Sequence, residues 1–243
     1  MAAAFPLRPL ALLLSLAVIA ASPPAAAGPG TLLVGNKAGD TLWRLSLADG
    51  HRMGEAATAA APHEIIVSHD GRTAVVSEYG RDTAGHTLGV YDAHAGTLRR
   101  RIDLGQHTRP HGMRFTGDGA YVLVTTEGSD ALLQVGLDGK LARAFDIGPG
   151  KGHMVALSPD GRHAYVTKVE AGTLARVQLA DGEVVEKPAG AGAEGIAVAV
   201  DGSVWVSNRE AGTVTVHDPE TLDVLATLDS SSRCSCPPWL ACS

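Results

Sequence analysis

The feature that most constrains the fold is a series of four Asp-Gly pairs at a nearly regular spacing. Asp70-Gly71, Asp118-Gly119, Asp160-Gly161 and Asp201-Gly202 follow one another at spacings of 48, 42 and 41 residues. Each pair lies between two short runs of alternating apolar residues. An Asp-Gly pair in that setting predicts a β-hairpin, because glycine readily takes the positive φ of a tight turn. A period of this length is typical of a chain built from stacked copies of one unit.

Each repeat is predicted to hold four antiparallel strands. The first three strands of the four repeats are expected near residues 63–67, 74–77 and 88–91, then 112–115, 121–124 and 132–135, then 154–157, 164–167 and 174–177, and finally 195–198, 204–207 and 214–217. A fourth run closes the unit, as at 97–104 and 223–228. Four strands per 41 to 48 residues without a helical period indicate an all-β fold, a β-propeller of four-stranded antiparallel blades stacked around an axis.

The residues of the repeats resemble those of the YVTN-repeat β-propellers, the YncE-like family. The resemblance is carried by residues 62–77, 109–113 and 153–167 and extends from about Leu32 to Leu228. It implies an exported β-propeller, in a family that usually has seven blades. It does not imply one activity, because lactonases and quinoprotein dehydrogenase subunits are built in the same way and do different things.

The first 27 residues are predicted to be a signal peptide rather than part of the fold. Arg8 precedes an apolar run from Leu10 to Ala21, which is short for a membrane-spanning helix, and Ala25 to Ala27 fit a cleavage site. We therefore expect a periplasmic or secreted protein with no membrane span once the signal peptide is removed. Nucleic acid is not an expected partner, since the net charge is −6 and only ten Phe, Trp and Tyr residues are present.

Residues 28–228 are predicted to form about five blade units. Four are complete, whereas residues 32–36 and 41–47 align with the second and third strands of a blade that lacks its innermost strand. We expect a ring that is cut short at its carboxyl end and is left open. Residues 229–243 do not follow the repeat and hold all three cysteines, Cys234, Cys236 and Cys242. A zinc site and a disulfide are possible interpretations, and we favour a tail foreign to the repeat, such as a frameshift would produce.

Chain topology predicts which side chains surround the mouth of the channel. Residues just before the first strand and just after the second strand of a blade should meet at the same rim. Four residues stand seven positions before the Asp of each hairpin turn: His63, His111, His153 and Glu194. Imidazoles together with a carboxylate suit Zn or Cu, so these four are the predicted metal ligands. The alternative is that each histidine only begins an inner strand and hydrogen-bonds to nearby backbone.

A second set of rim residues follows the second strands: Glu78, Glu127, Lys168 and Asn208, with Asn36 in the partial blade. The predicted ligand-binding residues are Asn36, Glu64, Glu78, Glu127 and Asn208. The carboxylates of the rim, Glu64, Glu78, Glu127 and Glu194, could instead hold Ca²⁺ or Mg²⁺ as hard oxygen ligands. Such an ion would polarise an ester carbonyl in the manner of lactonase-type propellers. A basic run, Arg99 to Arg101, is expected to be solvated on an outer strand.

The sequence therefore predicts an exported β-propeller that binds a ligand or partner, either a small molecule or a periplasmic protein, at its channel mouth. No catalytic residues are evident. Two alternatives stay open: a metal-dependent hydrolase of lactonase type, and a periplasmic accessory protein that handles copper or zinc. The candidate cofactor is a divalent metal ion, Zn, Cu or Ca.

Overall fold

The computed structural model describes residues 30–230, which form 19 strands in five antiparallel sheets, here called blades 1 to 5. Blade 1 has three strands: β1 (Thr31–Asn36), β2 (Thr41–Ser46) and β3 (Arg52–Ala57). Blade 2 contains β4 (Pro62–Val67), β5 (Thr73–Gly80), β6 (Ala84–Asp92) and β7 (Leu98–Asp103), and blade 3 contains β8 (Pro110–Phe115), β9 (Tyr121–Thr126), β10 (Ala131–Gly136) and β11 (Leu141–Asp146). Blade 4 contains β12 (Gly152–Leu157), β13 (His163–Lys168), β14 (Thr173–Gln178) and β15 (Val184–Pro188), and blade 5 contains β16 (Ala193–Val198), β17 (Val204–Asn208), β18 (Thr213–His217) and β19 (Val224–Asp229).

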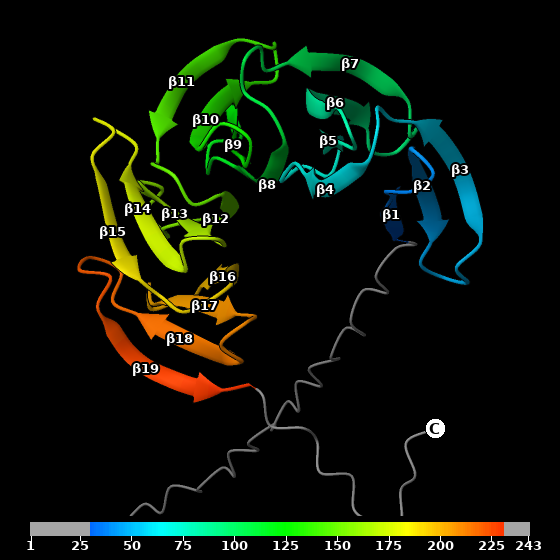
Figure 1. Cartoon of the computed structure of the whole chain (residues 1–243). Coiled ribbons are helices and arrows are strands. Elements are labelled where there is room, and N and C mark those ends of the chain that lie inside the picture. The colour runs from blue at the N-terminus through cyan, green and yellow to red at the C-terminus, as the bar shows by residue number, and fades with distance from the viewer. Residues whose placement is uncertain (1–29, 231–243) are drawn as a thin grey trace, which may run out of the picture.

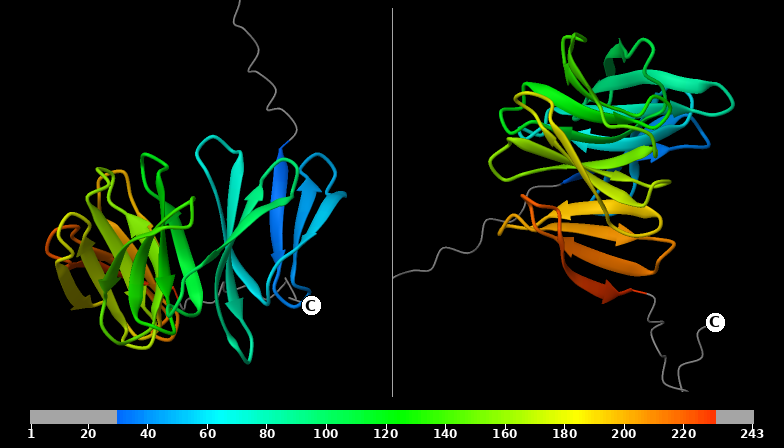
Figure 2. Two further views of the ribbon diagram at one scale, coloured as in Figure 1. Left: turned by 90° about the horizontal axis from the view of Figure 1, so that it is seen from above. Right: turned by 60° about the vertical axis from the view of Figure 1, so that its left-hand side comes forward.

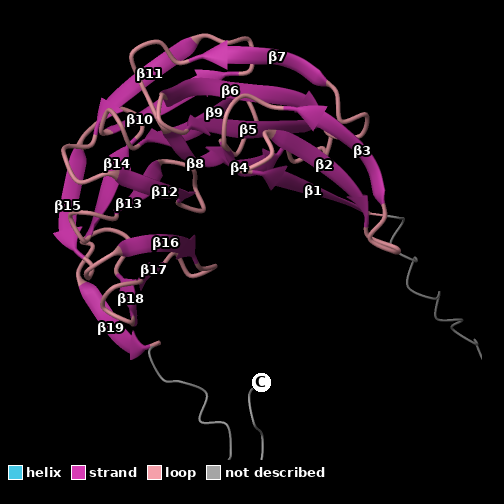
Figure 3. Cartoon of the chain, turned by 45° about the vertical axis from the view of Figure 1, so that its right-hand side comes forward, coloured by secondary structure: helices cyan, strands magenta, loops and turns pink. Residues whose placement is uncertain are grey.

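The blades stand side by side in an arc around a central axis (Figure 1). Strands β4, β8, β12 and β16 lie nearest this axis, and β7, β11, β15 and β19 form the outside of the arc. Blade 1 and blade 5 do not meet, so the ring is open (Figure 3). The predicted all-β propeller of five blade units, one of them lacking a strand, is confirmed. The predicted signal peptide at 1–27 and residues 231–243 of the predicted tail lie outside the described residues.

Alternating side chains hold the blades together. Successive residues of a strand point to opposite faces of its sheet, so each inner blade presents one apolar set to each neighbour. Val75 and Val90 of blade 2 pack against Val124 and Leu133 of blade 3. Equivalent clusters fill the interfaces between blades 1 and 2, 3 and 4, and 4 and 5. The stacking is seen from above in Figure 2.

The Asp-Gly turns close the hairpins as predicted. Gly71, Gly119, Gly161 and Gly202 all have positive φ, between 69° and 89°. In blade 2 the carboxylate of Asp70 accepts hydrogen bonds from the Ser68 hydroxyl at 2.6 Å and from the Arg72 amide at 3.0 Å. The residues between 30 and 230 include no helix able to cross a membrane.

The two ends of the arc expose apolar sheet faces. On blade 5, Val204 and Val206 pack toward blade 4. Trp205 therefore points the other way, on the face that it shares with its cross-strand partner Val216. Leu228 pairs with Val214 on this same face, and Trp205 and Leu228 are 38% and 46% exposed. On blade 1, Leu33 packs toward blade 2, so Leu32, which is 47% exposed, lies with its cross-strand partner Leu45 on the opposite face. Apolar faces of this kind favour association.

We predict that the purified full chain self-associates through this face of blade 5. Replacing Trp205 and Leu228 together by Lys should shift the sedimentation-velocity profile toward monomer, because charge on both sides opposes burial of the face. Leu141→Lys is the control, since Leu141 is similarly exposed but lies on outer strand β11. A wild-type chain that is monomeric at tens of micromolar would contradict the prediction.

Candidate functional site

The innermost strand of each complete blade begins with a β-bulge at the predicted rim residue. The pairing register shifts between Pro62 and Ile65, and equally between Pro110 and Met113 and between Gly152 and Val155. A bulge adds a residue to one strand and re-aims its side chains. The bulges contain His63, His111 and His153, whose imidazoles consequently leave the face of the sheet and point into the channel mouth.

Hydroxyl groups of the second strands hold these bulges and link neighbouring blades. Thr125 Oγ1 accepts a hydrogen bond from the Gly112 amide at 2.9 Å and donates to the carbonyl oxygen of His153, in the next blade, at 2.6 Å. Thr167 makes the same pair of bonds, to the Met154 amide at 3.1 Å and the Glu194 carbonyl at 2.7 Å. The backbones that carry adjacent rim residues are therefore tied directly to each other.

Glycine at position 112 allows blades 3 and 4 to approach this closely. A Cβ atom on Gly112 would lie 2.5 Å from the carbonyl oxygen of His153 and 2.7 Å from the Cα of Met154. Both neighbours are backbone atoms, so a side chain here would force the two inner strands apart. The absence of a side chain at 112 thus helps to set the distance between His111 and His153.

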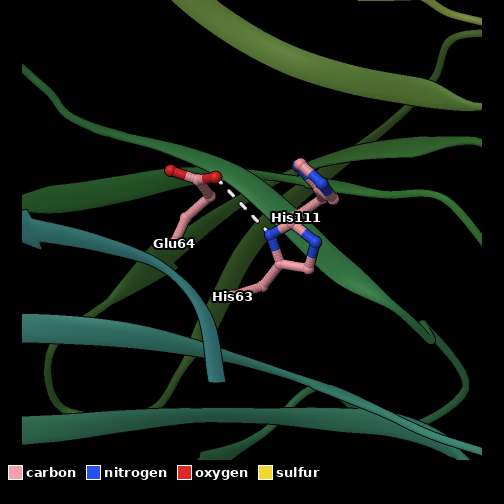
Figure 4. Close-up of side chains that lie close together, drawn as sticks. All are labelled: His63, Glu64 and His111. Carbon is pink, nitrogen blue, oxygen red and sulfur yellow. Dashed lines mark ion pairs between the residues drawn. The ribbon is translucent and has the colours of Figure 1, made fainter. Parts of the chain in front are cut away.

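The three imidazoles form a stack. The ring centroids of His63 and His111 are 4.1 Å apart, and those of His111 and His153 are 3.9 Å apart, with interplanar angles of 48° and 35°. His111, in the middle, is only 3% exposed, and its Nδ1 is buried without a hydrogen-bond partner. Figure 4 shows His63 and His111 beside Glu64, whose carboxylate lies 3.5 Å from Nδ1 of His63.

Glu127 is the carboxylate at the centre of the other side of the stack. Its Oε1 is 2.6 Å from Nδ1 of His153 and 3.8 Å from Nε2 of His111, while its Oε2 accepts a 2.5 Å hydrogen bond from the Tyr79 hydroxyl. Glu194 lies 3.6 Å from Nε2 of His153. The stack therefore lies between carboxylates of blades 2, 3 and 5.

Burial and charge shift the ionisation of this cluster. Burial lowers the pKa of His111 to about 3, and the neighbouring His153 and His63 act in the same direction. Burial alone would raise the pKa of Glu127, but hydrogen bonds from His153 and Tyr79 outweigh it and bring that pKa down to about 2. Burial, followed by the bond to Glu127, raises the pKa of Tyr79 to about 12. At neutral pH the cluster thus contains a neutral His111, an ionised Glu127 and a protonated Tyr79.

A cavity of about 470 Å³ opens over the stack at the channel mouth. The three histidines, Glu64, Glu127 and Glu194 all line it, so the structure brings together every predicted metal ligand and two of the five predicted ligand-binding residues. The remaining lining residues were not predicted: Lys37, Tyr79, Lys151, Met154, Val169 and Arg209.

The other three predicted ligand-binding residues point into their blades instead of into this cavity. The first residues of the innermost strands occupy equivalent positions in the four complete blades. Their cross-strand partners are Glu78 for Pro62, Lys168 for Gly152 and Asn208 for Ala193, but the partner of Pro110 is Thr126. Glu127 is therefore one position later than Glu78, not equivalent to it. Since alternate residues face opposite sides of a strand, this one-residue offset decides which side chains reach the channel.

The inward-pointing side chains have partners within their own blades. Glu78 is 1% exposed and binds Arg101 of the outer strand at 2.8 Å and Thr87 at 2.6 Å. The amides of Asn208 and Asn36 donate to Thr hydroxyls of the adjoining strands. The placement of Asn36, Glu78 and Asn208 at the channel mouth is corrected accordingly. Arg101, expected to be solvated, is the ion-pair partner of the buried Glu78.

Four of the six cavity residues that were not predicted from the sequence follow a simple rule. Lys37, Tyr79, Val169 and Arg209 each come directly after the inward-pointing residue at the end of a second strand, and Glu127 occupies the same position in blade 3. Each of the five blades thus contributes one residue to an outer ring around the stack. Correct alignment of the second strands would have identified this ring.

Comparison with known proteins supports the fold and does not assign an activity. No family model and no curated protein matches the chain. Among solved structures, virginiamycin B lyase from Staphylococcus aureus superposes with a TM-score of 0.71 at 14% identity, over 84% of this chain and 67% of the lyase. A 6-phosphogluconolactonase-like protein from Bacteroides uniformis gives 0.67 at 17% identity, over 84% of this chain and 68% of that protein.

Hydrazine synthase of Kuenenia stuttgartiensis gives a TM-score of 0.66 at 20% identity, over 77% of this chain and 59% of the synthase chain. These neighbours contain repeated four-stranded sheets around an axis. The chain has the β-propeller fold. It spans between 59% and 68% of the length of these three proteins. Membership of the YVTN-repeat family stays a prediction.

The ionisation of His111 predicts an acid-sensitive fold. Unfolded, His111 takes up a proton near pH 6.5, whereas in the folded protein it stays neutral down to about 3. The unfolded state therefore binds more protons in this range, and stability must fall as the pH falls through it. Glu127 adds to the loss of stability only below pH 4.5, the ordinary pKa of its carboxyl group. Between pH 7 and pH 5 we expect the free energy of unfolding to fall by about 1 to 2 kcal/mol because of His111.

Urea denaturation at pH 7 and pH 5 in the presence of a chelator measures this loss. His111→Asn should lose less stability between the two values than wild type, because the titrating group is gone. His94→Asn, at an exposed turn of blade 2, should behave as wild type. Equal pH dependence in wild type and His111→Asn would show that His111 is not held neutral.

Proposed function

We propose that this protein binds a divalent transition-metal ion, Zn²⁺ or Cu²⁺, at the mouth of its channel. The observation that carries the proposal is the cluster of His111, Glu127 and His153, whose ligand atoms all lie within 4.8 Å of one another. His63, Glu64 and His111 form a second group with the same property. Imidazole nitrogens with a carboxylate oxygen are a donor set that suits Zn²⁺ and Cu²⁺.

The protonation of the cluster also fits a metal. Metal ligands must be unprotonated, and the low pKa values of His111 and Glu127 keep both ready to coordinate at neutral pH. The buried Nδ1 of His111 lacks a partner, and an orphaned buried nitrogen of this kind is typical of a place where an ion or water binds.

A metal-dependent enzyme is the second candidate function. The observation in its favour is the size of the cavity, about 470 Å³, which leaves room for a small molecule beside the ion. A bound divalent ion polarises an ester or lactone carbonyl, and two propeller neighbours are a lyase and a 6-phosphogluconolactonase-like protein. Metal-dependent hydrolysis of lactones by the loaded chain would support this function over binding alone.

Export to the periplasm, or secretion, completes the proposal. It rests on the leader-like composition of residues 1–27 and is tested by the N-terminal sequence of protein recovered from a secreting host. Processed protein should begin near Gly28, and an intact Met1 would contradict export. A metal-binding propeller there would hold its ion for a small molecule or for a periplasmic protein.

Titration of the full chain with Zn²⁺ and Cu²⁺ by calorimetry tests the metal site. His111→Ala should weaken binding by about tenfold or more, because even the loss of a residue that supports a metal ligand commonly costs that much. His69→Ala is the control, since His69 is exposed in the Asp-Gly turn of blade 2, at the other end of β4. If wild type binds the metal and both variants bind it equally well, the histidines only begin inner strands.

A further inference from the structure

The rim of the cavity carries cations that the proposed metal site does not use. Lys37, Lys151 and Arg209 line the cavity, from loops beside blades 1, 4 and 5. Two of them already have carboxylate partners: Lys151 binds Glu170 at 3.0 Å, and Arg209 binds Glu194 at 3.0 Å. Lys37 is exposed, and its ammonium group lies over the ring of Tyr79, 5.3 Å from the centroid.

Tyr79 connects this rim to the metal cluster. The guanidinium carbon of Arg109 lies 5.0 Å from the Tyr79 ring, so the ring contacts a cation from blade 1 and another from the start of blade 3. Its hydroxyl donates to Glu127, one of the proposed ligands. Two cations are therefore held next to the cluster by an aromatic ring rather than neutralised by a carboxylate.

The charges of the lining residues favour an anion once a metal is present. The three lining carboxylates, Glu64, Glu127 and Glu194, equal in number the three lining cations. A divalent ion then gives the cavity an excess of two positive charges. The ion itself is the largest local charge in the site. The excess is local, since the whole chain carries a net charge of −6.

We propose that the metal-loaded cavity binds a small oxyanion, whose phosphate or carboxylate oxygens lie between the metal ion and Lys37. This inference rests on the proposed metal site and names the ligand class that the site takes. Lys37 acts as a point charge on a flexible stem, which suits either kind of oxygen. A metal alone would leave most of the cavity to water, whereas a small anion uses both the open positions of the metal and the unpaired cation.

The test is calorimetry on the full chain loaded with one equivalent of Zn²⁺, titrated in separate arms with inorganic phosphate and with acetate. Binding of either anion is the expected result, and the anion that binds with the higher affinity identifies the ligand class, phosphate or carboxylate. The same chain stripped of metal should bind that anion about tenfold more weakly or worse, as loss of a charged partner predicts.

Lys37→Met keeps the apolar stem of the side chain and removes its charge. This substitution should weaken binding of the anion by about tenfold, while the affinity for Zn²⁺ stays within about twofold of wild type. Lys140→Met is the matched control, because Lys140 pairs with Asp138 in an exposed turn of blade 3 and should leave both affinities unchanged. Zinc binding without either anion, or equal anion affinity in Lys37→Met, would overturn this inference and leave the metal site standing. A chain that binds no zinc would instead overturn the proposed function.

Discussion

The hydrogen bonds of the Thr125 and Thr167 hydroxyls are the interactions on which the site depends. Each hydroxyl satisfies a backbone amide inside one bulge and donates to the carbonyl of the next blade's rim residue, at 2.6 Å and 2.7 Å. Apolar packing between blades fixes how the sheets face each other but not where a particular backbone atom lies. The hydroxyls supply that register at the channel, and Gly112 removes the side chain that would prevent it. The close stack of His111 on His153 follows from both.

The stack explains why the cluster is electrostatically unusual. Three imidazoles with centroids about 4 Å apart could not all be protonated, because like charges at that distance repel strongly when partly buried. Burial resolves the conflict at the central ring by holding His111 neutral. Glu127, ionised by its bonds to His153 and Tyr79, then provides the negative charge against which a cation can bind. Neutral imidazoles beside an ionised carboxylate are the protonation state that a divalent metal requires.

Much of this architecture could be predicted from the sequence because the repeat is regular. The Asp-Gly turns gave the hairpins of blades 2 to 5, and counting back from them gave His63, His111 and His153 at one rim. The second strands were harder, because no turn residue marks where they end. Taking Glu127 as the equivalent of Glu78 shifted the alignment of the second strands by one residue. Residues that face the blade interior, such as Glu78, were therefore predicted at the channel in place of residues that do face it, such as Tyr79. The bulges could not be predicted either, since those of blades 3 and 4 depend on Thr hydroxyls that bridge two blades.

X-ray absorption spectroscopy of the zinc-loaded full chain shows which atoms hold the metal, because the scattering of the first shell depends on its ligand atoms. We expect nitrogen and oxygen ligands at about 2.0 to 2.1 Å with the outer-shell scattering of at least two imidazoles. We also expect this imidazole signal to weaken in His111→Ala. Sulfur ligands at about 2.3 Å, from the cysteines near the carboxyl end, or a shell of oxygen alone would contradict a metal site at the channel mouth.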